Sequence, residues 1–255
     1  DAIHPGVGFL SENPDFAEIV QEHGLTFIGP RPEHIRTMGD KIEAKKTALA
    51  LGLPCIPGSE NAIESLDEAI DIAKEIGFPV LIKASAGGGG RGMQLALEQK
   101  DLAKAINLAQ SEAQAAFGSS DVYIEKYLAN PRHIEIQIVG DQHGNVIHLG
   151  ERDCSLQRRH QKILEETPSP ALNGKTRLLA GQLAAESMQR FGYESLGTIE
   201  FLYENGKFFF IEMNTRLQVE HPITEMVTGI DLVRKQIQIS AGMPMDLVQE
   251  DIVFT

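Results

Sequence analysis

The 255-residue sequence predicts a mixed α+β fold, with one α/β fragment and a small, insert-like lid at about residues 55–127. Residues 1–30 have the loop, helix and strand order of part of an α/β unit. Residues 55–127 combine three short strand patterns with two helical patterns and a run of glycines. From residue 133 onward the strand patterns are longer and are joined by turns, which is typical of antiparallel pairing.

The amino-terminal elements end at a clear boundary. We predict a helix from residue 13 to about residue 23, a short strand at 26–29 and a helix at 41–51 that is rich in Ala, Lys and Leu. Pro54 and Pro57 then break the helical pattern. This break separates the first part of the chain from the compact block that follows.

The compact block alternates strands and helices. Ser65 can cap its first helix. Strands are predicted at 79–83, 93–97 and 121–127, with a strongly periodic helix at 101–117 before the last of them. We therefore expect these elements to form one small subdomain.

The last part of the chain is predicted to be mainly antiparallel. Strands are expected at 133–139, 145–150, 196–203 and 208–213, and a helix at 175–191. The last two strands are joined by Asn205–Gly206, a sequence typical of a hairpin turn.

The composition argues against two classes of partner. The 36 acidic residues outnumber the 23 basic ones, and a net charge of −13 repels nucleic acid and anionic membranes. No apolar run is long enough to span a bilayer, and no signal or transit segment is visible. Cys55 and Cys154 fit no CxxC pattern, so we expect a reducing compartment and no disulfide framework.

A run of glycines, interrupted by Arg91, occupies residues 87–92. Consecutive glycines leave backbone N–H groups free to surround an anion such as a phosphate. The run contains a formal GxGxxG, but residues 93–97 continue as a strand, and no P-loop lysine follows. We interpret it as a flap over nucleotide phosphates, with a plain surface turn as the alternative. Lys83 favours the flap, because a lysine in the apolar run 79–82 needs an anionic partner.

Polar residues occupy every second position between residues 212 and 220. They are Glu212, Asn214, Arg216, Gln218 and Glu220, with Met213, Thr215, Leu217 and Val219 between them. A period of two is the period of an extended strand, so we expect the five polar side chains on one face. Two carboxylates, an amide and a guanidinium together suit a site that holds a divalent cation and an anion.

The turn of the last hairpin decides whether Glu200 and Glu212 share a face. A two-residue turn pairs Tyr203 with Phe208 and places the two glutamates on opposite faces. A three-residue loop pairs Tyr203 with Lys207 and places both on one face. A shared Mg²⁺ or Mn²⁺ requires the second arrangement. We favour the metal, with a pair of solvated carboxylates as the alternative.

A basic cluster at residues 157–162 stands out in this acidic chain. It is either a solvated loop or the source of a positive field for an anionic substrate. The spacing around His133 does not by itself mark that residue as part of a site.

Several long motifs share one resemblance. They lie at residues 4–6, 8–13, 38–41, 83–93, 125–128, 131–133, 151–155, 157–162 and 212–225. Together they resemble the biotin carboxylase family of the ATP-grasp superfamily, and the resemblance covers essentially the whole chain. One departure is Val7, where the family generally has Tyr.

The resemblance implies an ATP-grasp fold with a small lid subdomain, truncated at both ends. Residues 1–30 would be the remnant of an amino-terminal nucleotide-fold domain, and residues 31–54 a linker helix. Residues 55–127 would form the lid subdomain. Residues 128–255 would form the catalytic subdomain, and an enolate-stabilising arginine of the family would lie beyond them.

The resemblance also implies ATP-dependent carboxylation of biotin by bicarbonate through carboxyphosphate. ATP would be bound by Lys41, Lys83, Gly88, Gly89, Gly90, Met93, Glu125, Lys126, Tyr127, Leu128, His133, Gln157 and His160. Mg²⁺ or Mn²⁺ would be held by Glu200, Glu212 and Asn214, and bicarbonate by Lys162, Arg216, Gln218 and Val219. Glu220 would be the general base, and Arg216 and Lys162 would act beside it in catalysis.

The partners implied are a biotin carboxyl carrier protein or domain, a carboxyltransferase component and, for the full-length protein, a second copy of itself. The location implied is cytoplasmic, or mitochondrial or plastid in a eukaryote, and one setting is fatty acid biosynthesis. The final carboxyl acceptor stays open. Two alternatives are another ATP-grasp ligase, such as half of a carbamoyl-phosphate synthetase, and a non-catalytic nucleotide-binding module.

Overall fold

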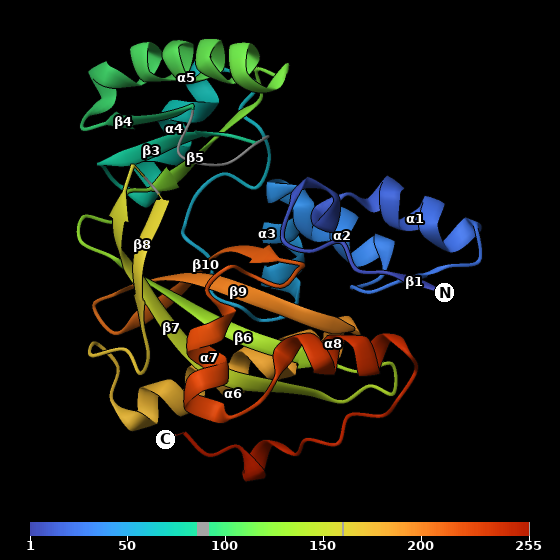
Figure 1. Ribbon diagram of the computed structural model, residues 1–255. Coiled ribbons are helices and arrows are strands. Elements are labelled where there is room, and N and C mark those ends of the chain that lie inside the picture. The colour runs from blue at the N-terminus through green and yellow to red at the C-terminus, as the bar shows by residue number, and fades with distance from the viewer. Residues whose placement is uncertain (86–91, 160, 255) are drawn as a thin grey trace.

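The computed structural model describes residues 1–85, 92–159 and 161–254, whose strands form three sheets (Figure 1). A two-stranded sheet lies near the amino terminus, a three-stranded sheet forms the upper body in Figure 1, and a five-stranded sheet forms the lower one. This agrees with the predicted mixed fold and its small subdomain. Gly88, Gly89, Gly90 and His160, all predicted to bind ATP, lie outside the described residues.

The amino-terminal part is helical around one short parallel pair. Strand β1 (Ala2–Ile3) pairs with β2 (Thr26–Phe27), and between them lie the 3₁₀ helix η1 (Phe9–Glu12) and helix α1 (Pro14–Glu22). Helix α2 (Pro32–Gly39) is an element that our sequence analysis missed. Its proline lies in the first turn, where the missing N–H costs nothing, so the residue begins the helix rather than breaking it.

Helix α3 (Lys41–Ala50) follows directly and positions two lysines used below. Asp40 separates it from α2, because the Asp40 side chain accepts hydrogen bonds from the N–H groups of Ile42 and Glu43. The helix packs beside strand β10 of the large sheet. Its predicted range of 41–51 is confirmed to within one residue.

The three-stranded sheet has the order β4–β3–β5, with β3 antiparallel to both neighbours. Its elements are α4 (Leu66–Ile76), β3 (Val80–Ala84), β4 (Met93–Ala96), η2 (Gln99–Asp101), α5 (Leu102–Phe117) and β5 (Val122–Lys126). Val80 and Ile82 are fully buried in the core formed with the two helices. Leu81 and Lys83 alternate with them and therefore point to the other face, toward the large sheet.

The large sheet has the order β10–β9–β6–β7–β8 and is antiparallel throughout. Its strands are β6 (Arg132–Gly140), β7 (Val146–Arg158), β8 (Gln161–Glu166), β9 (Ser195–Glu204) and β10 (Lys207–Asn214). Strand β7 is more than twice as long as the predicted strand at 145–150. The prediction stopped where charged residues interrupt the apolar pattern, but these residues pair with the neighbouring strands. The hairpin of β7 and β8 reaches toward the three-stranded sheet (Figure 1).

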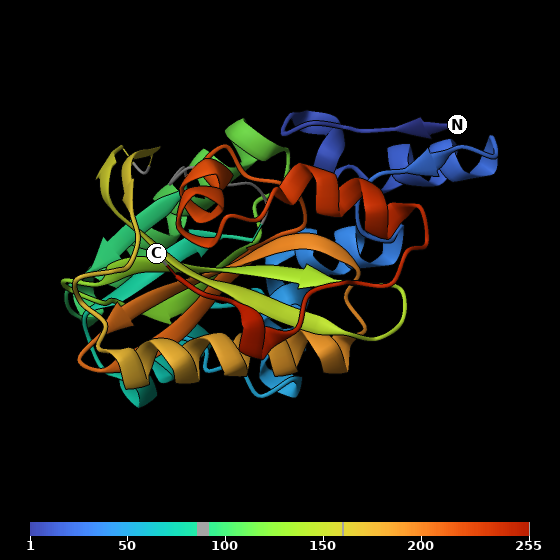
Figure 2. The same cartoon turned by 60° about the horizontal axis from the view of Figure 1, so that its bottom comes forward.

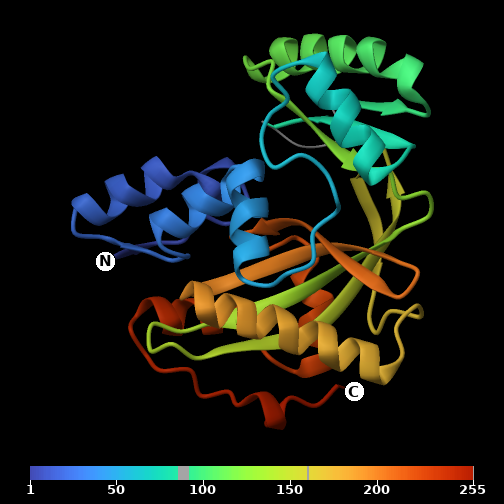
Figure 3. The ribbon, with the colours of Figure 1, turned by 180° about the vertical axis from the view of Figure 1, so that it is seen from behind.

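Helices cover both faces of the large sheet. Helix α6 (Gly174–Phe191) packs on one face, and α7 (His221–Thr228) and α8 (Leu232–Ser240) lie on the other (Figures 2 and 3). The close approach of α6 depends on Gly181, where a Cβ would lie 2.3 Å from the ring of His148. Helices α7 and α8 and the short η3 (Gln249–Asp251) were not predicted from the sequence. No helix among the described residues is long and apolar enough to cross a lipid bilayer.

Candidate active site

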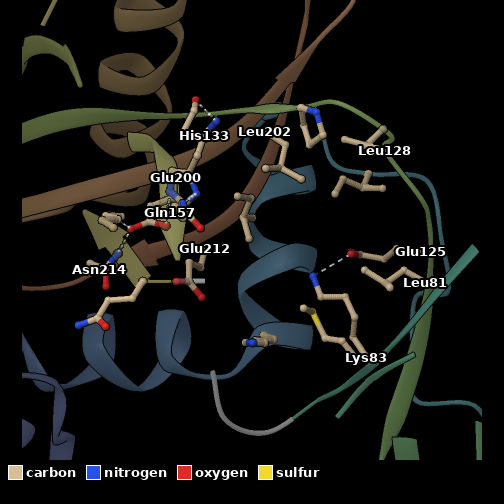
Figure 4. Close-up of a pocket in the computed structure, with 18 of the residues that line it drawn as sticks. Leu81, Lys83, Glu125, Leu128, His133, Gln157, Glu200, Leu202, Glu212 and Asn214 are labelled. Carbon is tan, nitrogen blue, oxygen red and sulfur yellow. Dashed lines mark hydrogen bonds and ion pairs between the residues drawn. The ribbon is translucent and has the colours of Figure 1, made fainter. Parts of the chain in front are cut away.

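A cavity of about 1020 Å³ opens between the small and the large sheet. Every predicted site residue that the structure describes lines it: Lys41, Lys83, Met93, Glu125, Lys126, Tyr127, Leu128, His133, Gln157, Lys162, Glu200, Glu212, Asn214, Arg216, Gln218, Val219 and Glu220. These residues come from α3, from both sheets and from the segment after β10. Figure 4 draws 18 of the residues that line it, with Lys83 and Glu125 on one side and Glu200, Glu212 and Asn214 on the other.

The two predicted metal carboxylates lie directly opposite each other on neighbouring strands, but not for the reason expected. The hairpin turn has two residues, since Phe208 pairs with Tyr203, and the favoured three-residue loop is therefore wrong. A register shift between Phe210 and Glu212 makes Glu212 the partner of Glu200. This β-bulge supplies the extra residue that we had placed in the turn.

The bulge lies where β10 is held from its outer side. The Phe210 N–H donates to the carbonyl of Pro54 at 2.7 Å, and Cys55 forms a bridge to the same residue. The segment after α3 therefore covers the edge of β10. A contact between segments more than 150 residues apart is invisible to a local reading of the hairpin.

Glu135 extends this pair into a row of carboxylates across three adjacent strands. Glu135 on β6 is the register partner of Glu200, and on its other side it pairs with Arg152 on β7. We call Glu135, Glu200 and Glu212 the carboxylate row. Like charges in directly opposed positions repel each other, so such a row is stable only with cations beside it.

The two predicted metal carboxylates have different pKa values. Burial and the negative charge of Glu200 raise the pKa of Glu212, although Lys41 lowers it in part. Burial would raise the pKa of Glu200 as well, but the His133 ring at 2.7 Å and Lys162 lower it well below its usual value. Glu212 forms no hydrogen bond or ion pair with any described residue, which leaves its oxygens available to a ligand.

The carboxylates and the Asn214 amide provide oxygen donors of the kind that Mg²⁺ and Mn²⁺ prefer. Asn214 donates from Nδ2 to Glu200 at 2.8 Å, and its Oδ1 accepts from Arg216 at 2.9 Å. The chemistry of these donors and the raised pKa of Glu212 both fit a divalent cation between the two glutamates.

The alternating segment forms a strand only as far as Asn214, so the prediction of one extended strand to residue 220 is wrong. Residues 215–220 are irregular, yet the polar side chains at 216, 218 and 220 still face the cavity. Arg216 is held by Glu12, whose Oε2 accepts from Nε at 2.7 Å and whose Oε1 accepts from the Thr215 N–H. An amino-terminal residue thus shapes the segment that follows β10.

Lys162 lies among three carboxylates. Its Nζ is 2.5 Å from Glu135, 2.7 Å from Glu200 and 2.7 Å from Glu220. Burial favours a neutral amine, but these negative charges outweigh it and raise the pKa of Lys162 well above its usual range. Burial would likewise raise the pKa of Glu220, yet Lys162 lowers it. Both groups are therefore charged at neutral pH.

The described residues of the basic cluster differ in their relation to the cavity. Gln157, Gln161 and Lys162 line it, whereas Arg158 and Arg159 are exposed to solvent. Gln157 bonds to His133 Nδ1 at 3.1 Å, and burial is offset by Glu200 so that the pKa of His133 is raised. His133 is thus fixed beside the carboxylate row, a position that its spacing did not indicate.

Arg152 is a fully buried residue that the sequence analysis overlooked. Its Nε donates to Glu135, and its terminal nitrogens donate to Gln137, Thr198, Gln218 and Thr224. The guanidinium joins β6, β7 and β9 to the segment that carries Gln218 and to the start of α7. The sequence contained one signal for a buried cation. Glu135 and Gln137 alternate with three isoleucines along β6, which is the pattern of a polar face on a buried strand.

The small sheet places a second ionic group at the other end of the cavity. Lys83 Nζ is 3.0 Å from Glu125 Oε2, which identifies the anionic partner expected for a lysine in an apolar strand. Burial alone would lower the pKa of Lys83, but Glu125 and Tyr123 raise it well above its usual range. Lys41 also faces this space, where burial lowers its pKa.

The edge of the cavity next to β5 is more apolar. Lys126, Tyr127 and Leu128 line it, and the Lys126 ammonium is bound by the carbonyls of Gly77 and Phe78, both at 3.0 Å. The apolar side chains of Ile56, Leu81, Met93, Leu202 and Ile211 complete this wall. A flat, mainly apolar group such as a nucleobase fits there.

A three-stranded lid facing an antiparallel sheet, with lysines at one end of the cavity and carboxylates at the other, defines an ATP-grasp domain. A family model described as "Carbamoyl-phosphate synthase L chain, ATP binding domain" matches residues 40–248, and one described as "Biotin carboxylase, N-terminal domain" matches residues 1–35. The chain belongs to the biotin carboxylase family.

Curated relatives agree with this assignment. The chain is 57% identical over 252 residues to a biotin carboxylase of Allochromatium vinosum and 54% identical over 253 residues to one of Haemophilus influenzae. These matches cover 98% and 99% of the chain but 56% of each relative. The chain thus spans little more than half the length of these relatives.

Solved structures are equally similar. A biotin carboxylase domain of 2-oxoglutarate carboxylase from Hydrogenobacter thermophilus, crystallised with MgADP, ADP and bicarbonate, has a TM-score of 0.95 at 51% identity. A Campylobacter jejuni biotin carboxylase, described as a beta-gamma-ATP complex, has a TM-score of 0.95 at 52% identity. Both matches cover 100% of this chain, and 56% and 57% of those chains.

Proposed function

We propose that the protein of which this chain is part carboxylates biotin, using ATP and bicarbonate, as the first half-reaction of a biotin-dependent carboxylase. The observation that carries the proposal is the carboxylate row with Lys162 and Glu220 beside it, facing Lys83 and Lys41 across one cavity. Such a cavity can hold the phosphates of ATP between a cation site and fixed ammonium groups.

ATP would lie with its base against the apolar wall beside Leu128 and its phosphates toward Lys41 and Lys83. Glu200, Glu212 and Asn214 would hold Mg²⁺ or Mn²⁺. When bound, the cation supplies neutralisation of charge on the transferring phosphoryl group. The three-stranded lid would exclude water from the reacting groups.

Bicarbonate would bind between Lys162 and Arg216, with the Gln218 and Val219 backbone N–H groups as further donors. Glu220 is ionised, and the Lys162 ammonium group holds its carboxylate at 2.7 Å. Glu220 can therefore take the proton of a bicarbonate bound beside Lys162. The freed oxygen attacks the γ-phosphorus, the bond from phosphorus to the ADP oxygen breaks, and carboxyphosphate and ADP result.

Carboxyphosphate would then break into CO₂ and phosphate. The phosphate takes the proton from N1 of biotin, and N1 forms a bond to the CO₂ carbon. Solved structures similar to this chain include the biotin carboxylase subunit of pyruvate carboxylase and a biotin carboxylase domain of 2-oxoglutarate carboxylase, the latter described as a dimer. We therefore propose a biotinyl carrier domain, a carboxyltransferase and a second copy of the chain as partners, in the cytoplasm or, in a plant, the chloroplast.

The alternative function is that of a carbamoyl-phosphate synthase, since the family model for residues 40–248 is named after that enzyme. Such an enzyme would also use ATP and bicarbonate. It would pass the carboxyphosphate to ammonia rather than to biotin. A non-catalytic nucleotide-binding module is disfavoured, because binding of a nucleotide alone does not need Glu220 and Lys162, which lie 2.7 Å apart and line the cavity with Arg216.

The test is ADP release by the full-length protein from ATP, bicarbonate and Mg²⁺, with and without free biotin. We expect turnover that depends on biotin and falls about 100-fold in Glu220→Gln, since general bases contribute about 10²–10⁴-fold. Glu186→Gln, an exposed position on α6, is the matched control and should leave turnover unchanged. ATP turnover that is indifferent to biotin but responds to ammonia would support the alternative instead.

A further inference from the structure

Helix α3 directs two lysines, one turn apart, toward the cavity. Lys41 lines the cavity itself. Lys45 follows four residues later, on the same face of the helix. It does not line the cavity but lies behind it, with 14% of its side chain exposed.

Lys45 reaches across from α3 to the small sheet. Its Nζ is 3.2 Å from Oε1 of Glu125 on β5, while Lys83 on β3 is 3.0 Å from Oε2 of the same carboxylate. The Glu125 side chain is only 7% exposed. Tyr123 completes the group, since both ammonium nitrogens lie over its ring, at 5.9 Å for Lys45 and 5.5 Å for Lys83.

The charges of Lys45, Lys83 and Glu125, which we call the lid cluster, do not cancel. Two ammonium groups share one carboxylate and leave a single positive charge. Because Glu125 binds each lysine through a different oxygen, one lysine can leave while the other keeps the carboxylate paired. Lys83 faces the cavity and can leave; Lys45, behind it, can stay.

We propose that Lys45 is a positioning residue for nucleotide binding: it keeps Glu125 paired, so that Lys83 is free to turn to a phosphate group. The inference rests on the proposed use of ATP. Without Lys45, a phosphate and a buried, otherwise unpaired carboxylate compete for the same ammonium group. Moving Lys83 would then leave Glu125 buried without a partner, which is costly.

The experiment is calorimetric titration of MgADP into the full-length protein and its variants. We expect Lys45→Met to weaken binding about tenfold, the equivalent of one charged hydrogen bond at the low end of its range. Lys45→Arg should bind within about threefold of the unchanged protein, since it restores the charge. Lys46→Met is the control, because Lys46 is exposed and its one ion pair with a described residue is to Glu43, at 3.2 Å.

The decisive variant is the double substitution Lys45→Met with Glu125→Gln. Because removing the carboxylate releases Lys83 whether or not Lys45 is present, the double variant should bind MgADP within about threefold of Glu125→Gln alone, a non-additive outcome that simple loss of structure does not give. Equal affinity in Lys45→Met and the unchanged protein would overturn the inference while leaving the proposed function intact. So would a double variant that binds MgADP about tenfold more weakly than Glu125→Gln alone. An unchanged protein that does not bind MgADP would overturn both proposals.

Discussion

The two ends of the cavity are built from the same kinds of side chain but carry opposite excess charge. The lid cluster has two lysines for one carboxylate. At the other end, the sheet cluster has four carboxylates, the carboxylate row and Glu220, which pair among the described residues with Arg152, Lys162 and the His133 ring. One end is therefore prepared for an anion and the other for a cation, and a cation-bound polyphosphate satisfies both.

The two clusters also differ in how they are supported. The lid cluster is joined by ion pairs from two bodies, α3 and the small sheet, and can rearrange. The sheet cluster is fixed by strand register and by Arg152, whose donors reach five side chains. A site that must hold a metal and a base in fixed positions is thus placed on the rigid sheet, while the part that closes over the ligand is held more loosely.

Removing Arg152 would break the sheet cluster and is the largest effect we expect. Arg152→Met leaves Glu135 with Lys162 alone and four buried polar groups without a donor, so we expect a loss of about 3–5 kcal/mol in the free energy of unfolding. Urea denaturation measures it. Arg158→Met, an exposed position on the same strand, should change stability by less than about 0.5 kcal/mol. A loss below about 1 kcal/mol in Arg152→Met would show that the row does not need its buried cation.

Neutralising one member of the row would sharpen the comparison between cation and anion ends. In Glu212→Gln we expect the Mg²⁺ concentration for half-maximal ATP turnover to rise about tenfold or more, because a charged metal ligand is lost. The protein should fold as before, since the Glu212 side chain forms no hydrogen bond or ion pair with any described residue. Lys83→Met is the counterpart: it should raise the KM for ATP with little change in the Mg²⁺ requirement. A shift of the same parameter in both variants would argue against two separate ends.

The smallest effect expected is a difference in pH dependence within the row itself. The pKa of Glu200 is lowered in the folded state, so its contribution to stability is present above its ordinary pKa of 4.5 and is lost as the pH falls. The pKa of Glu212 is raised, so its ionisation opposes folding at neutral pH and this penalty disappears as the pH falls toward 4.5.

Urea denaturation between pH 4 and pH 7 tests these signs in the metal-free protein. We expect Glu212→Gln to be more stable than the unchanged protein at pH 7, with the difference shrinking toward pH 4.5. Glu200→Gln should be less stable at pH 7, because Lys162 and His133 lose a shared partner. The same sign in both variants would show that burial, rather than the charges around each glutamate, sets their pKa values.

The sequence by itself determined the family of this protein, the residue types of its candidate site and most of its local elements. Lys83 in an apolar strand indicated an anionic partner, and the polar alternation from residue 212 indicated a site for a divalent cation and an anion. The motif resemblance identified the family, and every implied residue that the structure describes lines one cavity. These signals are local, because helix caps, periodicity and residue type are each contained in a short stretch of sequence.

The tertiary structure alone decided how these residues meet. The bulge that opposes Glu200 and Glu212 depends on Pro54 at the edge of β10, not on the turn that the sequence displays. Helices α7 and α8 and the strand β8 escaped prediction because their patterns gain meaning only when packed on the sheet. Three site residues were identified from their contacts in the structure: Lys45, Arg152 and Glu12. Their partners lie between 17 and 204 positions away in the sequence. Register and long-range ion pairs depend on which segments lie side by side, and residue type alone does not specify that.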